Sequence, residues 1–379
     1  MSRRRMLAAV AVAAVVTAGQ ARAEDGFKIG SSVGLTGYAA VIDHAWQDGL
    51  AIAAEALNAK GGLLGKKITV IFEDNHSQPQ DAMVGYRKMI SSDEVNLFDS
   101  GCVSAGNFAA AAFVARAELP MYLCSILPKR EQEQAWAFSF LAPPRFEMES
   151  RYRYLRDKTD IRKIGILYDP TPYALMMKDL GVEIAQSFGI EVVAQETYKP
   201  DDADMTVQIG RVKAAGGGAI VKIGQGGSTV TAAKNIKQLG LEDMLLMSSN
   251  DDGAIFQQAG QILGDRFLFV APPVQLPNEL KEGPAKDSVE AFLKYWKPKY
   301  PDRDPANSAR AWDSMMVLAK AVAIAQSTEG AAIRDATEKV PTYVGAYATF
   351  SFSPNQHVGI TENPFLIGEY ADGELVLAK

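Results

Sequence analysis

The feature that most constrains the fold is a repeated alternation of short apolar runs with longer amphipathic stretches, beginning at Phe27. Residues 27–33 have the length of a strand, and residues 43–59 that follow have apolar side chains at helical spacing, ended by Gly61-Gly62. Such alternation predicts βαβ units and a parallel sheet covered by helices. The pattern continues with strands expected at 68–72, 95–98 and 120–123 and helices at 80–90 and 108–116.

The alternation starts again after Pro143-Pro144, which predicts a second lobe from the middle of the chain. Its strands are expected at 164–168, 191–194, 219–223, 244–247 and 267–270, with helices between them. After Pro272-Pro273 the chain is mostly helical, at 286–295 and 306–325, and these helices need a sheet to cover. We expect them to return to the first lobe. Residues 347–352 and 365–370 have strand character, and Asp372-Gly373 predicts a hairpin turn before 375–377.

These patterns predict an α/β protein with two doubly wound parallel-sheet lobes joined by two or three crossing strands, and we expect a three-strand hinge. We assign residues 24–144 and 274–349 to lobe 1, and residues 145–273 and 350–379 to lobe 2. Two lobes also fit the length, because a chain of about 350 residues exceeds what one hydrophobic core usually organises.

The N-terminus has the pattern of an export signal. Arg3, Arg4 and Arg5 precede an uncharged apolar stretch at 6–17, and Ala21-Arg22-Ala23 is a small-residue cleavage site. We predict a signal peptide at 1–23 and a periplasmic product, exported by the Sec route, with a twin-arginine signal as the alternative. Loss of 1–23 lowers Lys+Arg from 39 to 35 against 45 Asp+Glu, so the net charge moves from −6 to −10. That acidity argues against a nucleic-acid partner.

Motifs for catalysis are missing from the sequence. The three histidines lie far apart with no metal-ligand spacing, and neither a G-x-S-x-G elbow nor a P-loop is present. Residues 224–229, with Asp243 downstream, match part of a dinucleotide fingerprint but lack its third glycine. We therefore expect no enzyme, metal or cofactor; a nicotinamide-dependent enzyme is the alternative, and a tight strand-to-helix turn is the preferred interpretation of this segment.

The loop at 101–106 is a candidate anion site. Its small residues lie between a predicted strand and a predicted helix, so Ser104 and neighbouring backbone amides could hold a carboxylate without any lysine or arginine. Alternatively, Ser104 is simply a helix N-cap. The only two cysteines are Cys102 and Cys124; a disulfide between them is possible in the periplasm, and the sequence leaves this open.

Three segments resemble a known family. Residues 34–37 (Gly-Leu-Thr-Gly), 58–68 (beginning Asn-Ala-Lys-Gly-Gly) and 72–75 (Phe-Glu-Asp-Asn) are similar to the opening of the type I periplasmic binding proteins that serve branched-chain amino acid and related ABC transporters. The resemblance implies a monomer that closes two lobes around a small molecule and delivers it to an inner-membrane permease. It also implies a ligand-binding wall formed by Tyr38, Ile42, Ser104, Ala105, Gly106, Cys124, Ser125, Tyr173, Gln225, Asn250 and Asp251.

One departure from the family bears on the ligand. Amino-acid binders that the chain resembles place an acidic residue against the ligand ammonium, and the simplest alignment puts Asn250 there. Because an amide cannot neutralise an ammonium, we expect a carboxylate with an uncharged body, such as an aromatic acid. A one-residue shift would bring Asp251 to this position, so an amino acid is the alternative ligand. A sensor that reports to a receptor is an alternative role.

Overall fold

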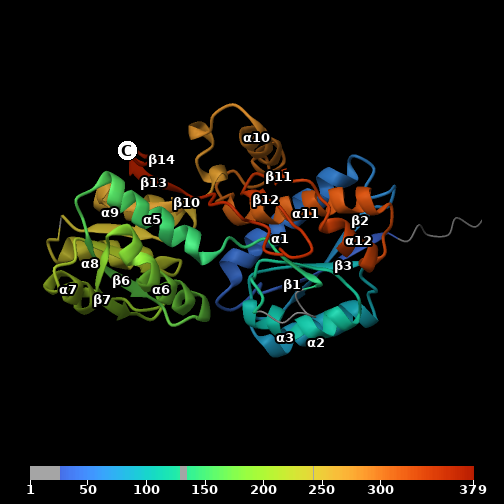
Figure 1. Cartoon of the computed structure of the whole chain (residues 1–379), viewed down its shortest axis with the longest axis horizontal. Helices are drawn as coiled ribbons and strands as arrows, with labels where there is room; N and C mark the ends of the chain where they lie inside the picture. Colours follow the sequence, from blue (N-terminus) through green and yellow to red (C-terminus); the bar gives the residue numbers. More distant parts are fainter. Residues whose placement is uncertain (1–25, 129–134, 242) are drawn as a thin grey trace, which may run out of the picture.

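The computed structural model describes residues 26–128, 135–241 and 243–379. The expected signal peptide at 1–23 lies outside them. Two separate sheets form two lobes, and the chain passes between them three times (Figure 1). The expectation of an α/β protein with two parallel-sheet lobes is confirmed.

Lobe 1 contains a five-stranded sheet of order β2-β1-β3-β4-β5 in which every pairing is parallel. Its strands are β1 (Phe27–Val33), β2 (Ile68–Asp74), β3 (Leu97–Ser100), β4 (Met121–Leu123) and β5 (Ala137–Ser139). The helices that follow these strands are α1 (Ala40–Asn58), α2 (Pro79–Ser91) and α3 (Ser104–Arg116). The sequence analysis missed β5.

Helices from the C-terminal third return to lobe 1, as expected: α10 (Pro284–Trp296), α11 (Ala306–Ala325) and α12 (Gly330–Thr337). Helix α11 packs closely against α1. Gly49 makes this approach possible, because a Cβ there would lie 2.2 Å from the carbonyl oxygen of Ser308. The Ser308 hydroxyl also donates to the Ala45 carbonyl at 2.8 Å. Distant parts of the chain thereby form one core.

Lobe 2 contains a seven-stranded sheet of order β14-β13-β10-β9-β8-β6-β7. Its strands are β6 (Lys163–Tyr168), β7 (Glu191–Thr197), β8 (Ala219–Ile223), β9 (Leu245–Ser248), β10 (Phe267–Ala271), β13 (Leu366–Ala371) and β14 (Glu374–Leu377). The helices are α5 (Pro144–Lys158), α6 (Pro172–Ala185), α7 (Thr206–Ala214), α8 (Gly227–Gln238) and α9 (Gly253–Leu263). The C-terminal hairpin β13-β14 adds an antiparallel edge, and Asp372 and Gly373 form its turn with positive φ, as predicted.

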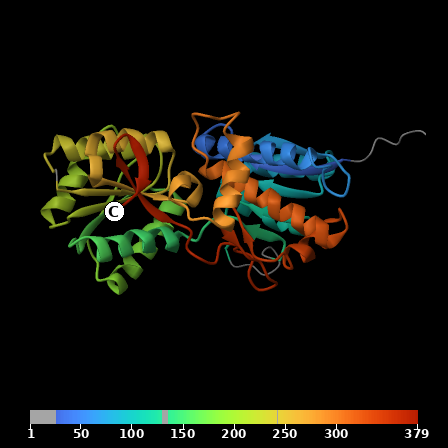
Figure 2. The same cartoon turned by 90° about the horizontal axis from the view of Figure 1, so that it is seen from above.

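The crossing segments follow β5, β10 and β12, so the hinge has three strands of chain (Figure 2). β11 (Tyr343–Val344) and β12 (Thr349–Phe350) form a small separate sheet. Residues 351–359 then lie against lobe 1, where Val358 bridges Ser139 and the Phe352 ring lies 5.5 Å from that of Phe138. Since the sequence assigned 350–379 to lobe 2, we propose that the last boundary lies later, near Ile360.

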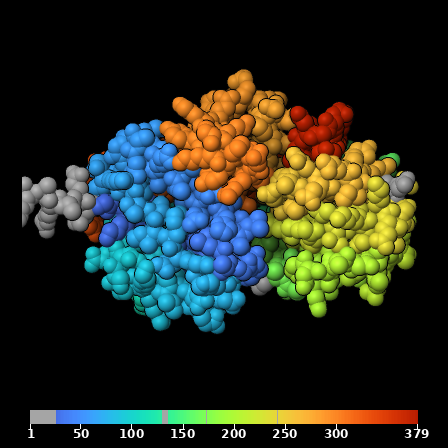
Figure 3. Space-filling model, turned by 180° about the vertical axis from the view of Figure 1, so that it is seen from behind, coloured from blue at the N-terminus to red at the C-terminus, as the bar shows by residue number. Residues whose placement is uncertain are grey.

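Within the described ranges, no helix is long and apolar enough to cross a membrane. All strands of the lobe 1 sheet are parallel, as are β6 to β10 in lobe 2, so each lobe collects the loops after its strands along one edge. Seen from behind, the blue and orange residues of lobe 1 and the yellow and green residues of lobe 2 form two rounded halves (Figure 3).

Candidate functional site

In lobe 1, the loops after β3 and β4 bring two serines together. The hydroxyl oxygens of Ser104 and Ser125 lie 3.2 Å apart. Asn107 donates its side-chain amide to the Ser125 hydroxyl and to the Gly101 carbonyl, each at 2.9 Å. Helix α3 has Val103 as its N-cap, so Ser104 is not simply an N-cap. The two hydroxyls are paired at the start of a helix, where the helix dipole favours an anion. The N–H groups of Ser104, Gly106 and Asn107 already donate to backbone carbonyls, so the hydroxyls are the main donors there.

A disulfide joins the same two loops. Cys102 and Cys124, 22 residues apart in sequence, are bonded with their Cα atoms 4.6 Å apart. The question that the sequence left open is thus answered by the geometry. Cys124 was a candidate wall residue; it is buried and its sulfur is used in the crosslink. Its role is therefore to hold the loop that carries Ser125.

Asp43 in the first turn of α1 connects the loops after β1 and β3. Its carboxylate accepts the backbone N–H groups of Gly34 at 2.7 Å and Cys102 at 2.6 Å. Burial raises the pKa of Asp43 to about 6, although both N–H groups and the Arg310 guanidinium act in the opposite direction. Gly101 is needed beside it, because a Cβ there would lie 2.5 Å from the carboxylate. The sequence analysis missed Asp43.

Arg310 of α11 is a second residue that the sequence analysis missed. It is 2% exposed, and its guanidinium lies over the rings of Trp46 at 5.6 Å and Tyr347 at 5.2 Å. Nη2 donates to the Asn307 side-chain oxygen at 2.7 Å and lies 3.4 Å from the Cys102 sulfur. A lone arginine in an apolar, Ala-rich helix was the available signal.

Tyr173, in the first turn of α6, is the predicted lobe 2 residue that meets lobe 1. It is partly buried, and desolvation raises the pKa of its hydroxyl well above the usual range. Glu147 raises the pKa further, while the guanidinium groups of Arg310 and Arg151 act in the opposite direction. Charged groups of both lobes therefore act electrostatically on this hydroxyl.

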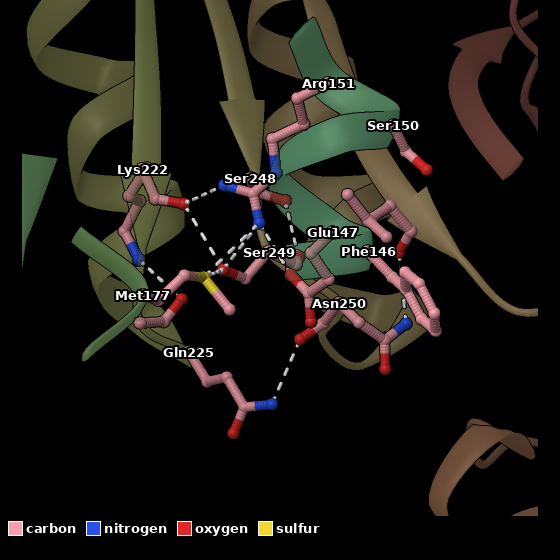
Figure 4. Close-up of polar contacts among 12 residues, drawn as sticks. Phe146, Glu147, Ser150, Arg151, Met177, Lys222, Gln225, Ser248, Ser249 and Asn250 are labelled. Carbon is pink, nitrogen blue, oxygen red and sulfur yellow. Dashed lines mark hydrogen bonds and ion pairs between the residues drawn. The ribbon is translucent and has the colours of Figure 1, made fainter. Parts of the chain in front are cut away.

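Arg151 ties α5 to the carboxyl ends of β8 and β9 (Figure 4). The side chain is fully buried, and its Nη2 forms an ion pair with Glu147 at 2.6 Å and donates to the Ser249 hydroxyl at 3.0 Å. Nη1 donates to the Lys222 carbonyl at 3.3 Å. The i, i+4 spacing of Glu147 and Arg151 was the sequence signal for this pair.

The Asn250 side chain is used inside lobe 2 and the hinge. It donates to the Val270 carbonyl at 3.1 Å and to the Gln275 side-chain oxygen at 2.8 Å. The backbone carbonyl of Asn250 accepts from the Gln225 side-chain amide at 3.0 Å (Figure 4). Gln275 also donates to Asp304, which accepts the Gly253 N–H at 2.9 Å. Asn250 thus belongs to a network that joins α9, the second crossing segment and the start of α11.

Asp251 is likewise occupied by internal contacts. Its carboxylate accepts the backbone N–H groups of Gly226 at 2.7 Å and Asp252 at 2.8 Å. Burial raises the pKa of Asp251 to about 6, opposed by those N–H groups and by Lys222. Gly224, with a φ of +117°, packs so closely that a Cβ would lie 2.2 Å from the Tyr198 hydroxyl. This packing supports the tight-turn interpretation of residues 224–229.

The remaining candidates lie around the edges of this arrangement. Tyr38 is 70% exposed just before α1, and Ile42 is partly buried in its first turn. Ala105 and Gln225 are exposed, whereas Gly106 is buried against Ala82. The structure therefore brings Ser104 together with Ser125, and Gln225 together with Asn250.

Comparison with known proteins decides the family. A family described as "Periplasmic binding protein" matches residues 26–374. The chain belongs to this family of solute-binding proteins. A curated relative of this binding protein, "Leu/Ile/Val-binding protein homolog 7" from Brucella melitensis, is 24% identical and aligned over 98% of the present chain and 95% of its own.

Solved structures agree on the fold of this binding protein. A type 1 periplasmic binding protein from Bordetella pertussis has a TM-score of 0.76 at 24% identity, covering 93% of the present chain and 99% of its own. The branched-chain amino acid transporter substrate-binding protein LivJ from Streptococcus pneumoniae, in complex with isoleucine, has a TM-score of 0.77 at 21% identity, with coverages of 92% and 97%. The predicted membership of the type I family is confirmed.

Proposed function

We propose that this chain is the periplasmic solute-binding component of an ABC importer, and that it binds a small carboxylate between its lobes without performing chemistry on it. The observation that carries the proposal is the Ser104–Ser125 hydroxyl pair, held on two disulfide-linked loops at the start of α3. Hydroxyl donors at a helix N-terminus suit a carboxylate. An inner-membrane permease would be the partner.

Hinge closure is the proposed mechanism. Ser104 belongs to lobe 1 and Tyr173 to lobe 2, so a ligand that contacts both binds one arrangement of the lobes in preference to others. The ligand then stabilises that arrangement, which the permease recognises. The chain acts as a monomer in this scheme, because both sides of the site come from one chain.

The body of the ligand is proposed to be uncharged. An ammonium needs a carboxylate partner, because an unpaired buried charge is costly. Two buried carboxylates of lobe 2 already have positive groups acting on them: Glu147 pairs with Arg151, and Lys222 acts electrostatically on Asp251, which also accepts two backbone N–H groups. Asn250 cannot supply the charge. The names of the Brucella relatives point instead to leucine, isoleucine or valine, so an amino acid is the competing ligand.

Matched pairs of ligands distinguish an uncharged carboxylate body from an amino acid. We would measure affinities for 3-phenylpropionate against phenylalanine, and for 4-methylpentanoate against leucine, by titration calorimetry at neutral pH. The members of each pair differ only by the α-ammonium. We expect the ammonium to weaken binding by at least about 100-fold, the order of the penalty for an unpaired buried charge. If leucine or phenylalanine binds more tightly than its partner acid, the proposal of an uncharged ligand body is wrong. If none of the four compounds binds, the proposed function is wrong for this class of ligand.

A further inference from the structure

We infer that Arg310 is the counter-ion of the ligand carboxylate and the residue that makes the site selective for anions. The inference rests on the proposed function and adds to it a charged group that the loops of Ser104 and Ser125 lack. It also changes the expectation from the sequence, in which the carboxylate was held without any lysine or arginine.

Arg310 is a buried charge without an ion-pair partner. Among the described residues its guanidinium forms no ion pair, and Nε has no hydrogen-bond partner. Asp43 acts on it electrostatically but lies beyond ion-pair distance, and its two oxygens accept the N–H groups of Gly34 and Cys102. Burying a guanidinium without an ion-pair partner costs free energy. We therefore infer that its partner is an anion that binds from outside the chain.

The guanidinium lies against the disulfide that joins the two serine-bearing loops. Nη2 is 3.4 Å from the sulfur of Cys102, two residues before Ser104, and Cys102 is bonded to the residue that precedes Ser125. From lobe 2, the Tyr173 hydroxyl interacts electrostatically with the same guanidinium. We therefore place the ligand carboxylate between the lobes, where it would accept from the Ser104 hydroxyl and pair with the guanidinium.

The surroundings of Arg310 orient it for this role. The rings of Trp46 and Tyr347 both lie within cation–π distance of its guanidinium carbon, which restrains the group without neutralising its charge. A restrained guanidinium presents a fork of N–H donors that matches a carboxylate in two-point geometry. Arg151 is the internal comparison: it is equally buried, yet it has Glu147 as its partner. Of these two buried arginines, Arg310 is the one that lacks an ion-pair partner among the described residues and could therefore pair with a ligand anion.

The test compares carboxylates with their amides. We would measure 3-phenylpropionate against 3-phenylpropionamide, 4-methylpentanoate against its amide, and leucine against leucinamide, for the unaltered protein, Arg310→Gln and Arg310→Met. Arg303→Gln is the control, because Arg303 also lies over a ring, that of Tyr300, but is mostly exposed and paired with Asp48. We expect the acid to be preferred by at least about 100-fold in the unaltered protein and in Arg303→Gln, and this preference to collapse to less than about 10-fold in both Arg310 variants.

Thermal unfolding distinguishes a binding role from a structural one. Because Arg310 has no ion-pair partner, we expect Arg310→Met without ligand to keep the Tm of the unaltered protein or exceed it. A lower Tm with an unchanged acid-to-amide ratio would assign Arg310 to structure and overturn the inference. An unchanged ratio in folded Arg310→Gln would also overturn it, while leaving the proposed function intact if the unaltered protein binds. If the unaltered protein binds no acid, both proposals fail.

Discussion

At the scale of single residues, one short polar side chain near the serine pair holds several other polar groups in place. Asn107 illustrates this: one amide group fixes the Gly101 carbonyl and the Ser125 hydroxyl, while its oxygen accepts from the buried Tyr86 hydroxyl at 2.8 Å. The hydrogen bond from Asn107 therefore holds the buried Ser125 hydroxyl in place. Ser104, in contrast, is only partly buried. The hydroxyl that contacts a ligand carboxylate directly is therefore expected to be that of Ser104.

Replacing Ser104 by alanine tests this expectation. Loss of a hydrogen bond to a carboxylate should weaken 3-phenylpropionate or 4-methylpentanoate binding by about 10- to 100-fold, with the Tm of the ligand-free protein nearly unchanged. Calorimetric titration gives the affinity. Ser91→Ala is the matched control, because the exposed Ser91 hydroxyl bonds only to the Arg87 carbonyl in the same helix at 2.8 Å. Equal affinities in Ser104→Ala and Ser91→Ala would count against the carboxylate site.

At the scale of elements, the site depends on the loops after β3 and β4. The parallel sheet places these loops side by side but does not fix one to the other. β3 and β4 are neighbours, so the loops after them start close together. The Cys102–Cys124 disulfide then fixes one loop to the other, and Asp43 fixes Cys102 to α1. The crosslink therefore stabilises the fold and orders the anion site at the same time.

Replacing both Cys102 and Cys124 by serine should separate these effects. Removing a crosslink of this span is expected to lower the free energy of unfolding by about 3 kcal/mol. It should also weaken carboxylate binding, because the two serine-bearing loops become independent. Ile333→Ala is the control: this buried residue of α12 should cost a comparable amount of stability, about 2–5 kcal/mol, without touching the loops. Denaturant unfolding and calorimetry measure both quantities; a double serine variant that binds as tightly as Ile333→Ala would refute the ordering role.

At the scale of the whole molecule, buried carboxyl groups make stability depend on pH. Burial raises the pKa of Asp99 to about 8, of Asp313 to about 7, and of Asp43 and Asp251 to about 6. In the unfolded chain an aspartate titrates near 3.8. Between these values the native state binds more protons than the unfolded state, so the free energy of unfolding falls as pH rises.

The ligand-free protein should therefore lose stability from pH 5 to pH 8, by at most about 1.4 kcal/mol per pH unit for each group within its window. Scanning calorimetry at constant ionic strength measures the trend. Asp99→Asn should flatten it over the whole range from pH 5 to 8, because the unfolded and native pKa values of Asp99 lie on either side of most of that range. The Ser314 hydroxyl can still donate to the carbonyl of the new side chain. Asp157→Asn is the control, because this exposed carboxyl has a lowered pKa. A Tm that rises from pH 5 to pH 8 would contradict the assignment of these four groups.

The sequence by itself determined the features that repeat locally. Apolar runs and helical spacing predicted most strands and helices, the restart after Pro143-Pro144 and the return of the C-terminal helices, because these depend on neighbours a few residues apart. The Ser104 loop and the family resemblance in 58–68 also came from contiguous residues. Two segments that depend on distant partners were missed: β5 is placed by its pairing with β4, and 351–359 lies against lobe 1 through Phe352 and Val358.

The tertiary structure alone decided how distant side chains are used. Asn250 stays a predicted wall residue, and only the structure shows that its side-chain amide also donates to Val270 and Gln275 in the hinge. Arg310 lies some 200 residues after Cys102 in sequence, yet contacts its sulfur because α11 packs on α1 through Gly49. The physical reason is that a charged side chain can bind a ligand of opposite charge when folding has removed its water and given it no ion-pair partner. Both conditions depend on residues far apart in sequence, so local periodicity does not reveal them.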